Sequence, residues 1–143
     1  MTRYLLDSNV ISNITKASPS VTLTHWLTEQ SDDSLFVASL VIAEIWFGIL
    51  ECSDGKKRAL LEKWFAGPEG QPNLFAGRIP PFDERAGLAW PRLMSDGERS
   101  GRSRSALDMM LAAIAEVNEC TVATDNERDF CGLRFINPTR AQG

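Results

Sequence analysis

The chain has 143 residues and a formal net charge of −4, with 15 Lys and Arg against 19 Asp and Glu. This length predicts one domain with a real hydrophobic core, and the acidic balance argues against a protein that binds polyanions without specificity. The three cysteines form no CxxC pair and His25 is the only histidine, which leaves no material for a disulfide framework, a thiolate zinc site or a histidine-based triad.

The first third of the chain alternates short apolar runs with helical patterns. Residues 4–6 predict a buried strand that stops at Asp7, with a helix just beyond it. A second helix is expected through Trp26, starting near Pro19. Residues 35–38 predict a second buried strand, too short to show alternation.

The middle of the chain is mostly helical in pattern. Residues 40–51 predict a helix capped by Ser39, and residues 56–66 predict a more amphipathic one. Residues 78–82 predict a short third strand, at an edge or a strand end because it contains two prolines.

The last third predicts two more helices and two more strands. One helix is capped by Asp83 and runs to about residue 94, with a kink at Pro91. Residues 95–105 predict a loop or a frayed helix end. The remaining elements are a helix at residues 106–117 and strands at residues 120–124 and 133–136.

This alternation predicts the fold class. Strands that alternate with helices from end to end are typical of an α/β domain. We therefore expect a three-layer α/β/α single domain with a central parallel sheet of four to five strands.

Three acids lie where an acid is costly. Asp7 follows a buried strand, at the edge where open α/β sheets bind ligands. Glu44 and Asp108 lie in apolar helices that we expect to be largely buried. Each has a plain structural alternative: Asp7 as a helix cap, Glu44 paired with an arginine or lying on a narrow exposed stripe of its helix, and Asp108 paired with Arg104 one turn before it.

One shared ion would account for all three acids. The acidic segment after the fourth strand, residues 125–129, is expected at the same sheet edge as Asp7. Oxygen ligands without His or Cys suit Mg²⁺ or Mn²⁺, and such ions serve phosphate chemistry. We therefore expect Asp7, Glu44 and Asp108 to bind metal, with capping of the first helix left to Ser8 or Asn9.

A basic group precedes Asp108 and can contact a nucleic-acid backbone beside the acids. It consists of Arg99, Arg102 and Arg104. The alternative is a solvated loop with no ligand.

Six segments, in this order, resemble the PIN-domain family and, within it, the VapC-type toxins of the FitB-like group. They span the chain from Tyr4 to about Pro138. The segments are LLDSNVIS (5–12), ASLVIAEIWFG (38–48), LFAGRIPPFDE (74–84), ALDMMLAAIA (106–115), VATDNERDF (122–130) and FINP (135–138).

The resemblance implies a fold and an activity. It implies a PIN-like nuclease domain over residues 1–138 followed by a C-terminal tail, residues 139–143. It also implies a Mg²⁺- or Mn²⁺-dependent endoribonuclease, the toxin of a type II toxin–antitoxin system. Asp7, Glu44 and Asp108 match the family's first three acidic positions.

The remaining site residues follow from the same resemblance. Ser8, Asn9 and Thr124 match small polar positions around the acids. The family's fourth acidic place holds Asn126, a neutral oxygen ligand, while Asp125 comes one residue early as a supporting polar group. Asp129 comes three residues late.

The resemblance also implies partners. Family members pair with a small VapB-like antitoxin whose tail blocks the acids, and they typically form homodimers. No apolar run is long enough for a membrane span and no signal-peptide segment follows Met1, so a cytoplasmic protein is expected.

Two other classes of function compete with this interpretation. Asn126 supports a non-catalytic PIN-like module that binds RNA or protein without cutting. Phosphotransfer or phosphatase domains are disfavoured, because no lysine follows Lys63 and Asn9 stands where a second Asp would be needed.

Overall fold

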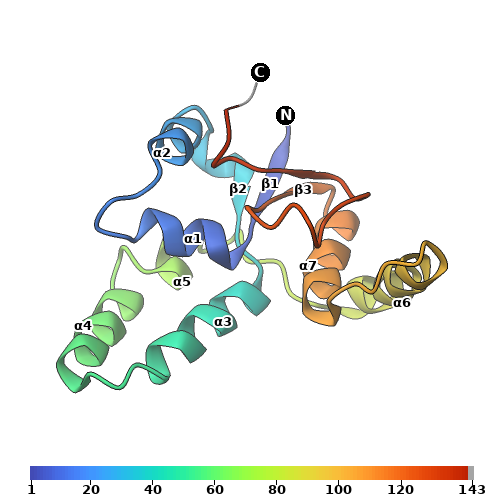
Figure 1. Ribbon diagram of the computed structural model, residues 1–143. Coiled ribbons are helices and arrows are strands. Elements are labelled where there is room, and N and C mark those ends of the chain that lie inside the picture. The colour runs from blue at the N-terminus through green and yellow to red at the C-terminus, as the bar shows by residue number, and fades with distance from the viewer. Residues whose placement is uncertain (142–143) are drawn as a thin grey trace.

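A computed structural model describes residues 1–141 (Figure 1). Its centre is a parallel sheet in the order β2–β1–β3–β4. The strands are β1 (Arg3–Leu6), β2 (Leu35–Phe36), β3 (Cys120–Ala123) and β4 (Phe135–Ile136). Leu6 pairs with Ala123, and Ala123 pairs with Ile136. The carboxyl ends of β1, β3 and β4 therefore meet at one edge of the sheet.

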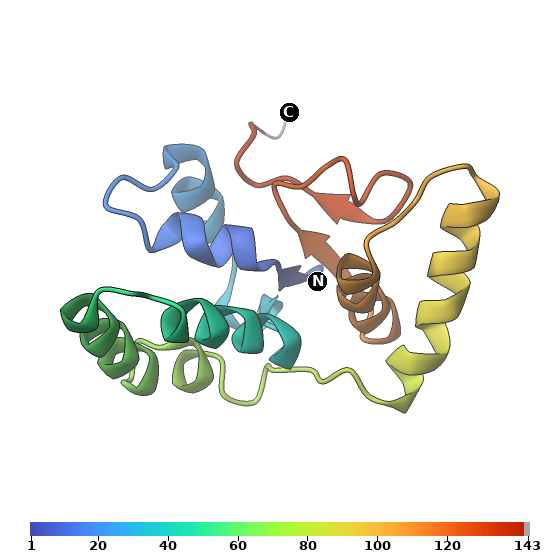
Figure 2. The same cartoon turned by 60° about the horizontal axis from the view of Figure 1, so that its bottom comes forward.

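The helices form two groups with the strands between them. In both Figure 1 and Figure 2, the helices α1 to α5 lie on one side of the strands, and α6 and α7 lie on the other. This arrangement confirms the predicted α/β architecture. The helices are α1 (Ser8–Ile14), α2 (Val21–Thr28), α3 (Ser39–Leu50), α4 (Gly55–Ala66), α5 (Gln71–Leu74), α6 (Glu84–Arg99) and α7 (Ala106–Val117), with a 3₁₀ turn, η1, at Asp32–Ser34.

The hydrophobic core lies between the sheet and both groups of helices. Leu5 and Leu6 of β1 are fully buried, together with Val10 of α1 and Ile114 of α7. Because β1 is central and apolar on both faces, it carries the core directly up to the sheet edge where Asp7 follows.

The prediction of a strand at residues 78–82 is wrong. This segment runs beside the end of β2, where Arg78 and Pro80 carbonyls accept hydrogen bonds from Val37 and Ser39 amides at 3.2 and 3.1 Å. Pro80 and Pro81 have no N–H group to donate, so the segment forms no regular ladder.

The helix before Asp108 is longer than expected. Asp83 caps it as predicted, accepting a hydrogen bond from the Ala86 amide at 3.0 Å. The helix then continues through Pro91 to Arg99, so the expected loop at residues 95–105 begins too early. The helix packs along α7, with Trp90 Nε1 donating to the Ala106 carbonyl at 2.9 Å. Its last turns contact the following loop, where the Arg102 amide donates to the Gly97 carbonyl at 2.9 Å and the Arg104 side chain lies against Gly97.

Two further details differ from expectation. Ser39 is the first residue of α3 and Ala38 is its cap, without a side-chain hydrogen bond. The helices α3 and α7 are not buried all round, because Phe47 is 64% exposed and Leu107 is 42% exposed.

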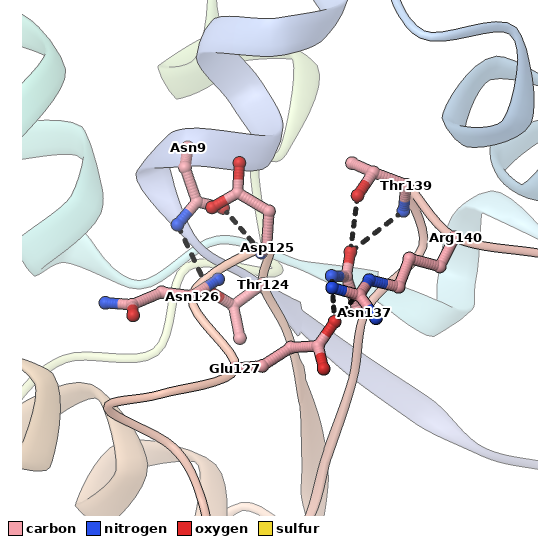
Figure 3. Close-up of polar contacts among 8 residues, drawn as sticks. All are labelled: Asn9, Thr124, Asp125, Asn126, Glu127, Asn137, Thr139 and Arg140. Carbon is pink, nitrogen blue, oxygen red and sulfur yellow. Dashed lines mark hydrogen bonds and ion pairs between the residues drawn. The ribbon is translucent and has the colours of Figure 1, made fainter.

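The predicted tail, residues 139–143, is described as far as residue 141. Residues 142–143 lie outside the described part of the chain. Thr139 contacts Asn137, and Arg140 pairs with Glu127 at 2.8 Å (Figure 3). The boundary at residue 138 stays a prediction. Within residues 1–141, no helix is long and apolar enough to cross a membrane.

Gly70, at the start of α5, gives a test of the helical packing. A Cβ atom at Gly70 would lie 2.0 Å from the Phe65 carbonyl oxygen, whereas one at Gly48 in α3 meets nothing within 4 Å. Gly70→Ala should therefore lower the free energy of unfolding by about 1–3 kcal/mol. Gly48→Ala, the matched control, should raise it by up to about 1 kcal/mol. Denaturant unfolding measures both, and equal effects would contradict the packing.

Candidate active site

Asp7 extends β1 by one residue and starts α1. Its amide donates to the Ala123 carbonyl at 2.9 Å, and its backbone is extended, with φ −75° and ψ 161°. Its Oδ1 accepts a hydrogen bond from the Ser8 amide at 2.7 Å, so Asp7 itself caps the helix. The expected capping by Ser8 or Asn9 is wrong, because the extended backbone before the helix turns at Asp7.

Neutral donors hold the other carboxylate oxygen of Asp7. Its Oδ2 accepts hydrogen bonds from Thr124 Oγ1 at 2.9 Å and from Asn9 Nδ2 at 3.2 Å. The side chain is only 6% exposed. Burial raises the pKa of Asp7, the charge of Asp125 raises it further, and the hydrogen bonds oppose this rise.

Thr124 and Asn9 join the ends of β1 and β3. The fully buried Thr124 hydroxyl donates to Asp7 and accepts from Asn9 Nδ2 at 3.1 Å and from the Asn126 amide at 3.0 Å. Asn9 Oδ1 accepts from the Asp125 amide at 3.1 Å (Figure 3). The hydroxyl thus uses its donor and both lone pairs, which fixes the Asp7 carboxylate.

Glu44 faces Asp7 from α3. It is half-buried, and Ser8 Oγ donates to its Oε2 at 3.5 Å, the limit for a hydrogen bond. Burial raises the pKa of Glu44, and so does the charge of Asp7. A groove of about 350 Å³ extends from Ser8 past Glu44 to Trp64, between α1, α3 and α4.

Asp108 faces Asp7 from the other side, in the first turn of α7. Ser105 caps that helix, accepting from the Asp108 amide at 3.2 Å. Burial, the charge of Asp7 and the neighbouring Asp129 carboxyl raise the pKa of Asp108 to about 6. The structure therefore brings Asp7, Glu44 and Asp108 together, although Glu44 and Asp108 are half-buried and not enclosed as expected.

Asp129 also reaches the cluster, from the loop after β3. Asn126 Nδ2 donates to Asp129 Oδ2 at 2.8 Å, and the Asp129 amide donates back to Asn126 Oδ1 at 3.4 Å. The carboxyl groups of Asp129 and Asp108 lie within hydrogen-bonding reach. The resemblance places Asp129 too late in the chain for this role, although an Asn side chain that bonds to nearby backbone amides is a known way to tighten a loop.

The ion-pair alternatives for Glu44 and Asp108 are wrong. Within residues 1–141, no ion pair includes Asp7, Glu44 or Asp108. Arg104 Nη1 instead donates to the Leu93 carbonyl at 2.7 Å. The acids are thus held by neutral groups only, and their mutual repulsion is uncompensated.

The donor set fits a hard divalent cation. Carboxylate, amide and hydroxyl oxygens surround Asp7, and such ligands suit Mg²⁺ or Mn²⁺. No three His, Cys, Asp or Glu side chains of the described residues converge on one point where an ion could be held. Proximity is pairwise: Asp7 faces Glu44 and Asp108, and Asp108 faces Asp129. Carboxylates that repel one another favour such spacing until a cation joins them.

The three arginines expected beside the acids differ in role. Arg99 is exposed and lies 3.9 Å from Asp96, and Arg104 is half-buried against α6. Arg102 and Arg104 line a hollow next to Asp129, whereas Arg99 is not among its lining residues.

Comparisons of sequence and of structure find similarity to the same group of proteins. The model of the PIN domain family matches residues 4–136. VapC ribonuclease Y4jK of Sinorhizobium fredii is 35% identical over 136 residues, covering 94% of this chain and 96% of that protein. Toxin FitB of Neisseria gonorrhoeae is 31% identical over 136 residues, with the same shares covered. The crystal structure of FitAcB from Neisseria gonorrhoeae has a TM-score of 0.88 at 30% identity, covering 94% of this chain and 97% of that one.

The raised pKa of Asp108 predicts how stability depends on pH. Folded Asp108 keeps its proton up to about pH 6, whereas an unfolded Asp loses it near pH 3.9. The folded state therefore binds more protons between these values, and the free energy of unfolding falls as pH rises through this window. In EDTA, Asp108→Asn should remove this pH-dependent fall in the free energy of unfolding and raise Tm at neutral pH.

Thermal unfolding followed from about pH 4 to 7 measures this effect. Asp33→Asn, which changes an exposed acid in η1, is the matched control and should keep the wild-type profile. An Asp108→Asn profile parallel to that of the wild type would show that folding does not raise the pKa of Asp108.

Proposed function

This chain belongs to the PIN-domain family, and from that premise we propose that it is a metal-dependent endoribonuclease, the toxin of a type II toxin–antitoxin system. One observation carries the proposal: the buried Asp7 faces Glu44 and Asp108 with no ion-paired base among the described residues. Such uncompensated charge at a sheet edge is costly, and an enzyme that binds a cation there gains from it. The similarity to a VapC ribonuclease over nearly the whole chain supports the same conclusion.

We propose Asp7, Glu44 and Asp108 as the ligands of Mg²⁺ or Mn²⁺. A bound ion of this kind polarises a phosphoryl oxygen and lowers the pKa of water, which is the chemistry that phosphodiester hydrolysis requires. Asn9 and Thr124 keep the Asp7 carboxylate in one orientation through their hydrogen bonds to Oδ2.

Asp129 supplies the fourth carboxylate in this proposal. Asn126 Nδ2 donates to this carboxylate and the Asp129 amide donates to Asn126 Oδ1, while the neighbouring Asp129 carboxyl raises the pKa of Asp108. Asn126 itself stays a candidate ligand, because Oδ1 keeps one lone pair beside its bond to the Asp129 amide. The loop thus replaces the missing charge at Asn126 by an acid three residues later.

We also propose the partners that the resemblance implies. A VapB-like antitoxin would place a tail in the groove between α1, α3 and α4, where a basic side chain can reach Glu44. Phe47 of α3 is exposed beside this groove and suits an apolar contact, with the antitoxin or in a homodimer. RNA cleavage would take place in the cytoplasm.

A second function has one observation in its favour. The acids of the described residues do not converge on a single point, and Asn126 carries no charge. Both features suit a PIN-like module that binds RNA or protein without cleavage. Metal binding separates the two functions.

The first test is RNA cleavage. Wild-type protein should cleave RNA with Mg²⁺ or Mn²⁺ and stop when EDTA is added. Asp7→Asn and Asp108→Asn should each lower the rate by more than about 100-fold, because loss of even an outer-shell partner of a metal costs about 10–100-fold. Asp33→Asn serves as the control with unchanged cleavage. Full cleavage activity of either site variant would contradict the proposed role of that acid as a metal ligand.

The second test is calorimetric titration with Mn²⁺. The enzyme should release or absorb heat on binding, whereas a module without a metal site should give no signal. Asp129→Asn and Asn126→Ala should each weaken Mn²⁺ binding by about 10-fold, because Asn126 acts by holding Asp129. Equal affinity of Asp129→Asn and wild type would exclude Asp129 from the site.

A further inference from the structure

A hollow of about 480 Å³ lies beside the acidic cluster, on the side away from the groove at Glu44. The loop between α6 and α7 forms one wall and the loop after β3 forms the other. Asp129 lies at the boundary, because it lines the hollow and its carboxyl also meets Asp108. A chain that occupies the hollow therefore continues directly into the carboxylates.

Two arginines of this hollow have free guanidinium groups. Arg102 and Arg128 are exposed, and neither side chain forms a hydrogen bond, ion pair or ring contact with another described residue. Arg58 and Arg78 are engaged, because Arg58 pairs with Glu62 at 2.9 Å and Arg78 donates to backbone carbonyls. A guanidinium group matches phosphate geometry and binds it through charge-assisted hydrogen bonds, so two of them on facing loops can hold an anion.

Arg104 fixes the floor between these two loops. Its guanidinium donates to the Leu93 carbonyl, and its side-chain carbons lie so close to Gly97 that a Cβ there would come within 2.7 Å. Gly101, with φ +74°, makes the turn that leads the chain from α6 to Arg102. The packing of α6 thus shapes the hollow. Arg104, its third arginine, is held against α6 by these contacts.

We propose that this hollow binds a backbone phosphate of single-stranded RNA next to the bond that is cleaved, with Arg102 and Arg128 as its ligands. The inference rests on the proposed function, because it takes the carboxylates as the reacting centre. A phosphate is the favoured occupant because the hollow is open, polar and lacks an apolar anchor, so it suits backbone contact and carries no base readout. Arg128 was not among the arginines expected from the sequence, and Arg104 takes a structural role.

The test measures RNA binding separately from cleavage. Fluorescence polarisation of a labelled single-stranded RNA is followed in EDTA at several salt concentrations. Arg102→Ala and Arg128→Ala should each weaken binding and lower the slope of log Kd against log salt by about 0.7. Arg134→Ala is the matched control, because Arg134 is exposed, has no side-chain partner among the described residues and precedes β4 at the opposite sheet edge.

Lysine variants distinguish a charge effect from a structural one. Arg102→Lys and Arg128→Lys keep the charge and should keep most of the salt slope. The subsite is overturned if both alanine variants keep the wild-type salt slope, or if Arg134→Ala lowers the slope by the same amount. Cleavage of RNA by the wild-type protein would still support the proposed function in that case. Wild-type protein that neither binds nor cleaves RNA overturns both. Loss of antitoxin binding without loss of RNA binding assigns the hollow to a protein partner and overturns the subsite.

Cys131 supplies a second readout. It is exposed and lines the hollow, whereas Cys52 lies elsewhere and is half-buried. Saturating RNA should slow alkylation of Cys131 and leave Cys52 unchanged, as measured by mass spectrometry of the peptides. Equal rates for Cys131 with and without RNA contradict occupation of the hollow.

Discussion

The site depends on how the Asp7 carboxylate is held. It lies almost fully buried at the end of the central strand, and its partners are a hydroxyl, a side-chain amide and a backbone amide. These groups orient and solvate the charge, but they do not neutralise it. Burial therefore still raises the pKa of Asp7. The carboxylate keeps this orientation because β1 and β3 pair up to its position and Thr124, Asn9 and the Ser8 amide all donate to it.

Two further acids share this constraint from opposite sides. Glu44 approaches from the group of α1 to α5, and Asp108 approaches from α7 (Figure 2). Each feels the charge of Asp7, and Asp108 adds the neighbouring carboxyl of Asp129. The sheet edge thus collects negative charge from both layers of helices. Removing one acid is expected to relieve repulsion and to remove function together, which is the usual conflict between stability and activity at a site.

The two flanks of the acidic cluster have different chemistry. The groove past Glu44 combines apolar side chains of α1, α3 and α4 with small hydroxyl side chains of α1 and its end. The hollow past Asp129 is lined by arginines and small polar residues. This contrast is consistent with a protein partner on the first flank and a nucleic-acid backbone on the second. Both flanks meet at the same carboxylates. A protein bound in the groove can therefore block access of a nucleic acid to these carboxylates.

The sequence by itself determined the architecture and three acids of the candidate site. Short apolar runs identified β1 and β3, and helical periodicity identified α3 and α7. The rule that parallel strands end together placed Asp7 and residues 125–129 at one edge, and the cost of an acid in an apolar helix singled out Glu44 and Asp108. Contacts between distant segments decided the rest. Pro80 and Pro81 could not complete a ladder beside β2, and the last turns of α6 pack against the loop that holds Arg102 and Arg104. Asn126 donates to Asp129, Arg104 donates to the Leu93 carbonyl, and Arg128 has no side-chain partner within residues 1–141. Such choices depend on which partner lies within reach in three dimensions, and local pattern carries no information about that.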